Sequence, residues 1–235
     1  MTGGNTSDTN LIRGKQPVIF CDFDGTITEN DNIIAIMKHF RPDGWETIVA
    51  DIIAQRITIQ HGVGQLFALL PTSRREEIVA FALDNMRIRA GFAELLQLCR
   101  ERGIRFLVTS GGIDFFVQPT LAPFAIESGD IYCNGSDFGG ESILITWPHA
   151  CDEACAGGGC GMCKTRIIRR FPQNRYTRIL IGDSVTDFEG AKLADLIFAR
   201  SHLIDKCAEL GMPYVPFETF HTVADTLARM LKEEP

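Results

Sequence analysis

Four short runs of apolar residues constrain the fold of this chain more than any other feature. They occupy residues 17–21, 105–109, 178–181 and 195–199 and are rich in Val, Ile, Leu and Phe. Strands that are covered on both faces have this nearly unbroken apolar pattern. Helical patterns at 91–103 and 184–195 separate the runs, and strands that alternate with helices predict an α/β fold with a parallel sheet between two layers of helices.

Two long segments interrupt this alternation. Residues 29–90 contain helical patterns at roughly 30–40, 45–55, 59–70 and 73–88. This is too much chain for one crossover, so we expect a small helical lobe over the sheet, with Ser73 and Glu76 as a capping box for its last helix. Residues 130–163 contain two strand-like pieces, a Gly-rich turn and four cysteines.

Acidic residues follow two of the predicted strands. Asp22 and Asp24 end the first run, and Asp183 and Asp187 follow the third run with the spacing of one helical turn. Because ligands bind outside the carboxyl ends of parallel strands, we expect these acids to converge there. Converging carboxylates repel unless a cation lies among them, and Mg²⁺ prefers oxygen ligands, so the pattern predicts a magnesium site.

Ser110, Gly111 and Gly112 follow the second run. We expect a turn here that presents a hydroxyl and close backbone N–H groups, which suits an anion, and an anion next to a metal suggests phosphate. Asp-Gly and Ser-Gly-Gly are also common turn sequences, and any one of them alone would be read as a turn. Three such endings at one sheet edge favour a functional site.

Charge and composition exclude several classes of partner. The formal net charge is −7 and 45% of the residues are hydrophobic, so we expect a globular protein that binds neither nucleic acid nor a membrane surface. Residues 1–16 lack the apolar stretch of a signal peptide. We therefore expect them to form a mobile tail on a cytoplasmic protein, and the sequence leaves the oligomeric state open, a homodimer included.

The motifs "DFDGT", "SGG", "CKTRIIRRF" and "GDSVTD" resemble, in order and spacing, the four motifs of the haloacid dehalogenase-like hydrolases. The helical insertion after the first motif is similar to the cap of their phosphoserine phosphatase-like branch. This resemblance implies a three-layer, Rossmann-like core at 17–28 and 91–235, with the hairpin and cysteine segment at 130–163 as an insertion. It implies a helical cap at 29–90 that closes over the site.

The resemblance also implies a Mg²⁺-dependent phosphatase that works through an aspartyl-phosphate. Asp22 would be the nucleophile, and Asp24 the general acid and then the general base. Asp183 would bind Mg²⁺ together with the Asp22 carboxylate and the Asp24 carbonyl, while Asp187 supports the metal and its waters.

The other two motifs of the resemblance supply the phosphate site. Ser110 and Gly111 would bind phosphoryl oxygens, and Lys164 would neutralise charge on the phosphate and on Asp22. A lysine in the first turn of a helix is otherwise most often simply solvated.

Further stretches, including "GVGQLFALLP", "SGGIDFFV", "IYCN" and "WPHAC", resemble the methionine-salvage phosphatases of that branch. This implies a small phosphorylated metabolite, a methylthio-bearing enol-phosphate, as the substrate. Phosphoserine or another small phosphomonoester is the alternative within the superfamily. A zinc-bearing, non-catalytic binding module is the alternative outside it.

Residues that would read the substrate beyond its phosphate are sought in the cap. Glu29, Asn30 and Asn32 lie just past the first motif, and Phe67 and Leu70 could contact a methylthio group. A Phe and a Leu at helical spacing are, however, more often part of the core.

Four cysteines crowd into thirteen residues of the second insertion. Cys151, Cys155, Cys160 and Cys163 have a C-x3-C-x4-C-x2-C spacing, close to pairwise zinc spacing but with a short central gap. A structural Zn²⁺, reduced structural thiols and a pair of disulfides all remain open. His149 could be a further zinc ligand or a turn residue. We expect the cluster to fix the loop that carries Lys164.

Overall fold

The computed structural model describes residues 14–232, and these contain seven strands in one sheet. The order is β4-β3-β2-β1-β5-β6-β7. All neighbouring strands are parallel except β3 and β4. The strands are β1 (Gln16–Cys21), β2 (Arg105–Ile113), β3 (Ile131–Asp137), β4 (Leu144–Thr146), β5 (Tyr176–Gly182), β6 (Leu196–Ala199) and β7 (Val215–Pro216). The predicted α/β fold with a largely parallel sheet is confirmed.

Ten helices accompany the sheet within these described residues. They are α1 (Asn32–Phe40), α2 (Trp45–Ile53), α3 (Ile59–Ala68), α4 (Arg75–Asn85), α5 (Phe92–Glu101), α6 (Asp114–Leu121), α7 (Lys164–Ile168), α8 (Val185–Ala191), α9 (Ser201–Glu209) and α10 (Phe220–Lys232). None of the helices in the described part of the chain is long and apolar enough to span a lipid bilayer.

The central strand β1 divides the core into two layers because its side chains alternate between the faces of the sheet. Val18 and Phe20 pack with residues of α7, α8 and α9, while Ile19 and Cys21 pack with residues of α5, α6 and α10. All four side chains are fully buried. A strand covered on both faces needs apolar residues at every position, which explains the unbroken run that the sequence shows.

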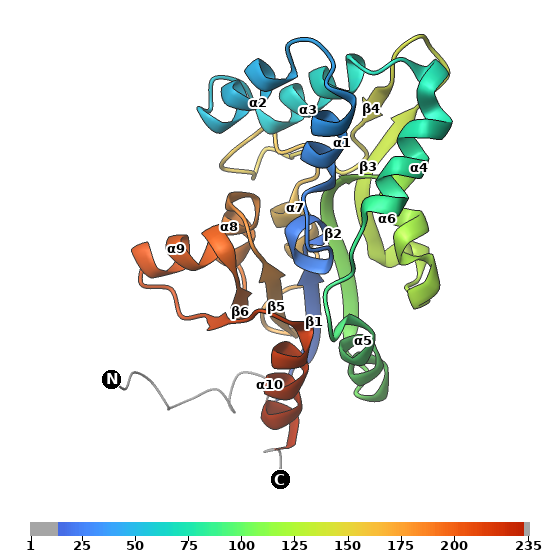
Figure 1. The fold of residues 1–235 in the computed structure, drawn as a ribbon. Helices are drawn as coiled ribbons and strands as arrows, with labels where there is room; N and C mark the ends of the chain where they lie inside the picture. Colours follow the sequence, from blue (N-terminus) through green and yellow to red (C-terminus); the bar gives the residue numbers. More distant parts are fainter. Residues whose placement is uncertain (1–13, 233–235) are drawn as a thin grey trace.

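Helices α1 to α4 lie between β1 and α5 along the chain and stand above the carboxyl ends of the strands (Figure 1). The chain leaves and re-enters the sheet region side by side, since Thr28 and Ile88 form an antiparallel bridge. The Glu29 backbone N–H donates to the Arg87 carbonyl at 2.9 Å. The position of α1 to α4 fits the expected cap at 29–90. The closure of this cap over the site stays a prediction.

Two details differ from the sequence-based expectation. Ser73 lies in a short 3₁₀ turn, η3 (Thr72–Arg74), and α4 begins at Arg75 without a side-chain cap, so the predicted capping box with Glu76 is wrong. The turn and the helix are continuous, which leaves no extended N-cap residue at position 73. Gln16 belongs to β1 rather than to a tail, while residues 1–13 of that predicted tail lie outside the described residues.

Candidate active site

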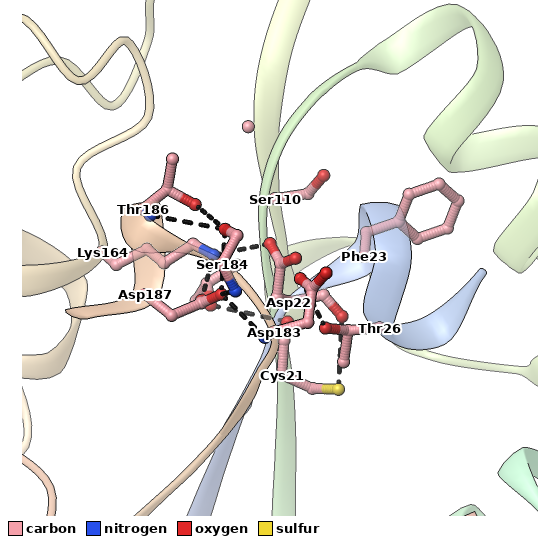
Figure 2. A network of polar contacts seen from close by, with 12 residues as sticks. Cys21, Asp22, Phe23, Thr26, Ser110, Lys164, Asp183, Ser184, Thr186 and Asp187 are labelled. Carbon is pink, nitrogen blue, oxygen red and sulfur yellow. Dashed lines mark hydrogen bonds and ion pairs between the residues drawn. The ribbon is translucent and has the colours of Figure 1, made fainter. Parts of the chain in front are cut away.

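Three carboxylates from three different elements meet at the carboxyl edge of the sheet. Asp22 follows β1, Asp183 follows β5, and Asp187 lies in the first turn of α8. One carboxylate oxygen from each lies within 4.8 Å of the other two. Figure 2 shows the three side chains gathered beside Lys164. Asp22 and Asp187 are buried and Asp183 is half-buried. A buried set of hard oxygen donors fits a divalent cation such as Mg²⁺.

Lys164 neutralises part of this negative charge. Its ammonium group lies 2.5 Å from Asp22 Oδ1 and also forms an ion pair with Asp187. The lysine is the first residue of α7 and is only 5% exposed, so it is not the solvated side chain that its position in a helix would suggest. The structure thus brings together four of the residues singled out in the sequence.

The loop before α8 is organised around the Asp187 carboxylate. Its Oδ2 accepts hydrogen bonds from the backbone N–H groups of Asp183 and Ser184, both at 3.1 Å. Asp187 and Ser184 together form a capping box at the start of α8. Because Oδ1 of Asp187 faces Lys164, this side chain ties the lysine to the loop that carries Asp183.

Asp24 points to a different partner. Its Oδ1 accepts hydrogen bonds from the backbone N–H of Asn32 at 3.0 Å and from the Asn32 side-chain amide at 2.6 Å. Burial and the nearby negative charge of Asp31 raise the pKa of Asp24 to about 7, although the bonds from Asn32 oppose this. A carboxyl group with such a pKa can hold a proton near neutral pH and then release it.

Ser110 lies inside β2 rather than in a turn after it, which corrects the sequence-based expectation. β2 runs to Ile113 and therefore includes the Ser-Gly-Gly segment. Its pairing with β3 is irregular between Thr109 and Ile113. The Gly112 backbone N–H donates to Ser110 Oγ at 2.9 Å. A Cβ on Gly112 would lie 2.7 Å from Asp24 Oδ2, which places both polar side chains around this glycine.

Burial shapes the charge state of the carboxylate group. It raises the pKa of Asp22 well above the ordinary value, against the opposing attraction of Lys164. It also raises the pKa of Asp183 to about 6, with repulsion from Asp187 adding to the effect. Burial alone would lower the pKa of Lys164, but the attraction of Asp187 and Asp22 raises it overall. The site therefore favours an added cation.

Two glycines make room for these carboxylates. A Cβ on Gly25 would collide with Asp183 Oδ2, and a Cβ on Gly182 would collide with the Asp187 carboxylate. Gly25 also has a φ of +76°, a left-handed conformation that side chains disfavour. The glycine of the "DFDGT" motif is thus required both by the backbone and by the acid beside it.

Three residues that the sequence analysis did not single out hold the turn η2 (Phe23–Ile27) next to the site. Thr26 Oγ1 donates to Asp183 Oδ1 at 3.2 Å. The Arg89 guanidinium donates to the carbonyls of Thr26 and Gly25 at 2.8 and 2.9 Å, and Arg200 donates to the Gly25 carbonyl at 2.5 Å. Only the threonine in the motif could have been found from the sequence, since both arginines depend on contacts between distant segments.

The cap candidates fall into two groups. Phe67 and Leu70 are buried in the apolar core, where Phe67 packs edge-on against Phe115, so the core interpretation of this pair holds. Glu29 is exposed, and Asn30 donates to Asn32 Oδ1 at 2.8 Å. Asn32 therefore positions Asp24. None of the described contacts of these cap residues identifies a methylthio pocket.

The cysteine segment lies between β4 and α7. The sulfur atoms of Cys151, Cys155 and Cys163 lie within 4.8 Å of one another, and Cys160 Sγ is 3.9 Å from Cys155 Sγ. All four are free thiols, so the structure contains none of the disulfides left open above. His149 does not belong to this group, and its ring packs against Tyr132.

The family is identified by sequence comparison. The family model described as "haloacid dehalogenase-like hydrolase" matches residues 19–192. This range contains Asp22, Asp24, Ser110, Lys164, Asp183 and Asp187. The chain therefore belongs to the haloacid dehalogenase-like hydrolases, as its motifs suggested.

Close relatives within this family carry one shared name. The chain is 56% identical to the 2-hydroxy-3-keto-5-methylthiopentenyl-1-phosphate phosphatase of Brevibacillus brevis, over 93% of this chain and 98% of the relative. It is 55% identical to the protein of the same name from Geobacillus kaustophilus, over 92% and 97% of the two chains.

Solved structures of more distant proteins share the fold. A phosphoserine phosphatase, solved as a phospho-aspartyl intermediate analogue, superposes with a TM-score of 0.65 at 17% identity, over 93% of this chain and 98% of that one. A HAD family hydrolase from Salmonella enterica serovar Typhi gives a TM-score of 0.68 at 15% identity, over 94% and 73% of the two chains. At these identities the likeness confirms the fold alone.

Proposed function

We propose that this chain is a cytoplasmic, Mg²⁺-dependent phosphatase of methionine salvage. Its substrate would be 2-hydroxy-3-keto-5-methylthiopentenyl-1-phosphate, and its products the dihydroxy-ketone and phosphate. The observation that carries the proposal is the buried group of Asp22, Asp183 and Asp187 beside Lys164, in a chain 56% identical to a relative of that name.

Asp22 is the proposed nucleophile. Its carboxylate attacks phosphorus, the bond to the leaving oxygen breaks, and an aspartyl-phosphate forms. Asp24 gives its proton to that leaving oxygen and then takes a proton from the water that hydrolyses the intermediate. The raised pKa of Asp24, about 7, and its fixed position against Asn32 support this role.

A Mg²⁺ ion is the proposed cofactor. The carboxylates of Asp22 and Asp183 and the carbonyl of Asp24 would hold it, with Asp187 supporting the arrangement. The ion would supply positive charge for the phosphoryl oxygens. The donor set fits, because the buried carboxylates offer only hard oxygen ligands and Lys164 alone does not balance their charge.

Ser110, Gly111 and Lys164 form the proposed phosphate site. The Ser110 hydroxyl and the Gly111 backbone N–H donate to the phosphoryl oxygens, and the Lys164 ammonium balances their charge while holding Asp22. The burial of Ser110 and Lys164 supports this role, because hydrogen bonds and charge contacts are stronger away from bulk water.

The proposal is tested by phosphate release from a panel of substrates with and without Mg²⁺. The panel contains the methylthio enol-phosphate, phosphoserine and a generic aryl phosphate. Asp22→Asn removes the nucleophile, and Asp205→Asn on the exposed side of α9 is the matched control. We expect Mg²⁺-dependent turnover that strongly favours the enol-phosphate, with loss of at least about 10⁴-fold in Asp22→Asn only.

Each other outcome has a defined meaning. Preference for phosphoserine or similar rates for all substrates would overturn the substrate assignment but leave the phosphatase chemistry. Absence of phosphate release from every substrate would favour a non-catalytic binding module.

A further inference from the structure

The distances between the cysteine sulfurs are closer to those of a metal site than to those of a disulfide. Two thiolates bound to one tetrahedral Zn²⁺ at about 2.3 Å are separated by about 3.8 Å, whereas the sulfurs of a disulfide are about 2.05 Å apart. Cys155 Sγ and Cys160 Sγ are 3.9 Å apart. Cys151, Cys155 and Cys163 already form a mutual group, and Cys160 adjoins it through Cys155.

The backbone of the loop is folded around these sulfurs. Gly158, Gly159 and Gly161 have φ values of +59°, +60° and +78°, which lets the chain reverse within a few residues. The Cys160 backbone N–H points at Cys151 Sγ over 3.4 Å. Backbone donors of this kind stabilise the negative charge of thiolate ligands.

The loop is held by side-chain and backbone contacts rather than by regular structure, since Arg166 donates to the Ala150 carbonyl at 2.9 Å and Arg169 forms an ion pair with Asp152. Residues 147–163, all of them described, contain no helix or strand, and of these only 161–163 are buried. Loops of this length without secondary structure of their own are uncommon in compact domains. An internal cross-link through a metal would stabilise such a loop further.

The loop contacts two other elements, at its carboxyl end and at its Gly-rich middle. Cys163 immediately precedes Lys164 and is the N-cap residue of α7. The Gly159 carbonyl accepts a hydrogen bond from the Gln60 backbone N–H at 2.9 Å, and a Cβ on Gly159 would lie 2.5 Å from Thr58 Cβ. The cysteine loop therefore connects the phosphate-binding lysine to the first turn of α3.

We propose that Cys151, Cys155, Cys160 and Cys163 bind one Zn²⁺ and that this ion fixes both Lys164 and the first turn of α3. Binding releases the four thiol protons and forms four Zn–S bonds, with no change of oxidation state. The effect on Lys164 rests on the proposed function, whereas the metal site does not.

Metal analysis of the full-length chain, purified under reducing conditions and incubated with Zn²⁺, tests the site. We expect about one tightly bound zinc per chain. Cys155→Ser and Cys160→Ser should each lose most of it, while Cys207→Ala, which alters a buried cysteine on α9, should keep it. Replacement by Co²⁺ should give the absorption of a tetrahedral thiolate complex. Wild-type chain without bound zinc, or with disulfides within 151–163, would overturn the proposal.

Hydrogen exchange tests what the ion holds in place. Removal of zinc by a chelator should increase exchange in 147–168 and at the start of α3, and leave α9 unchanged. The same exchange pattern with and without zinc would contradict a positioning role. Neither readout needs turnover, so a failure of the substrate assignment and a failure of the zinc site are distinguishable.

Discussion

Lys164 and Asp22 form a buried ion pair, with 2.5 Å between Nζ and Oδ1, although they are 142 positions apart in the chain. The lysine also faces Asp187, so one cation joins β1, α7 and α8 at the carboxyl edge of the sheet. Removing one partner of a buried pair leaves an uncompensated charge, which is strongly destabilising. The pair therefore supports both the fold and the proposed chemistry.

Lys164→Ala should lower the free energy of unfolding of the metal-free protein by about 3–5 kcal/mol and abolish phosphatase activity. The matched control is Lys206→Ala, which removes an exposed lysine paired with Glu209 on α9 and should cost less than about 1 kcal/mol. Urea unfolding measures the free energy of unfolding of both variants. A loss below about 1 kcal/mol in Lys164→Ala would contradict a structural role for the pair.

The pKa of Asp24, about 7, predicts the alkaline limb of activity. A general acid works only while protonated, so kcat/KM should fall about tenfold per pH unit above 7. Asn32→Ala removes a hydrogen bond that favours the charged carboxylate, so the limb should move to higher pH. Asp31→Asn removes a neighbouring negative charge, so the limb should move to lower pH. Shifts in the same direction, or none, would exclude Asp24 as the titrating group.

Asp183 should make the metal-free protein less stable as pH rises. Its pKa is about 6 when folded and near 3.8 when unfolded, so the folded state binds more protons between these values. Stability from this group is therefore present below about pH 4 and is lost by about pH 6. Asp183→Asn lacks this loss, so its melting temperature relative to wild type should rise across the interval.

Added Mg²⁺ should reverse that order at pH 7.5. Wild type binds the ion and gains stability, whereas Asp183→Asn has lost a ligand. Asp205→Asn is the control for the loss of one carboxylate and should follow wild type throughout. If Asp183→Asn is less stable than wild type without Mg²⁺ at pH 7.5, the cost of burying the charged Asp183 carboxylate beside Asp187 is not the dominant effect.

Gly91 tests the junction between the helical insertion and α5. It has a φ of +84°, and a Cβ there would collide with the His221 backbone at the start of α10. Gly91→Ala should therefore lower the free energy of unfolding by more than the about 1–3 kcal/mol that backbone strain alone usually costs. Gly103 has a φ of +63°, and a Cβ there would meet no atom within 4 Å. Gly103→Ala therefore measures the backbone strain without a collision. Equal losses in the two variants would show that the collision is relieved.

The sequence predicts the sheet well because the central positions of buried parallel strands are apolar on both faces, as at 18–21 in β1 and 179–181 in β5. The acids at their ends follow from the same logic, since chain direction alone brings Asp22 and Asp183 to one edge. The prediction of a capping box at Ser73 was wrong because Ser73 lies in a 3₁₀ turn that runs directly into α4. β7, with two residues, is too short to leave a pattern.

Residues that act through distant contacts could not be predicted. Arg89 and Arg200 clamp the turn after Asp22 from segments far along the chain, and nothing in their neighbours indicates this. Ser110 was placed at the right edge but assigned to a turn, because its place in β2 depends on pairing with β3, whose register shifts between Thr109 and Ile113. Such details depend on register, which spacing in one sequence does not determine.

The most direct test of the account is whether Asp22 carries the phosphoryl group. Beryllium fluoride binds to a carboxylate as a stable analogue of an aspartyl-phosphate, so fluorine NMR can follow it without turnover. The account predicts bound-fluoride signals that require Mg²⁺, disappear in Asp22→Asn and persist in Asp205→Asn. Signals that survive in Asp22→Asn, or that never form in wild type with Mg²⁺, would contradict Asp22 as the nucleophile.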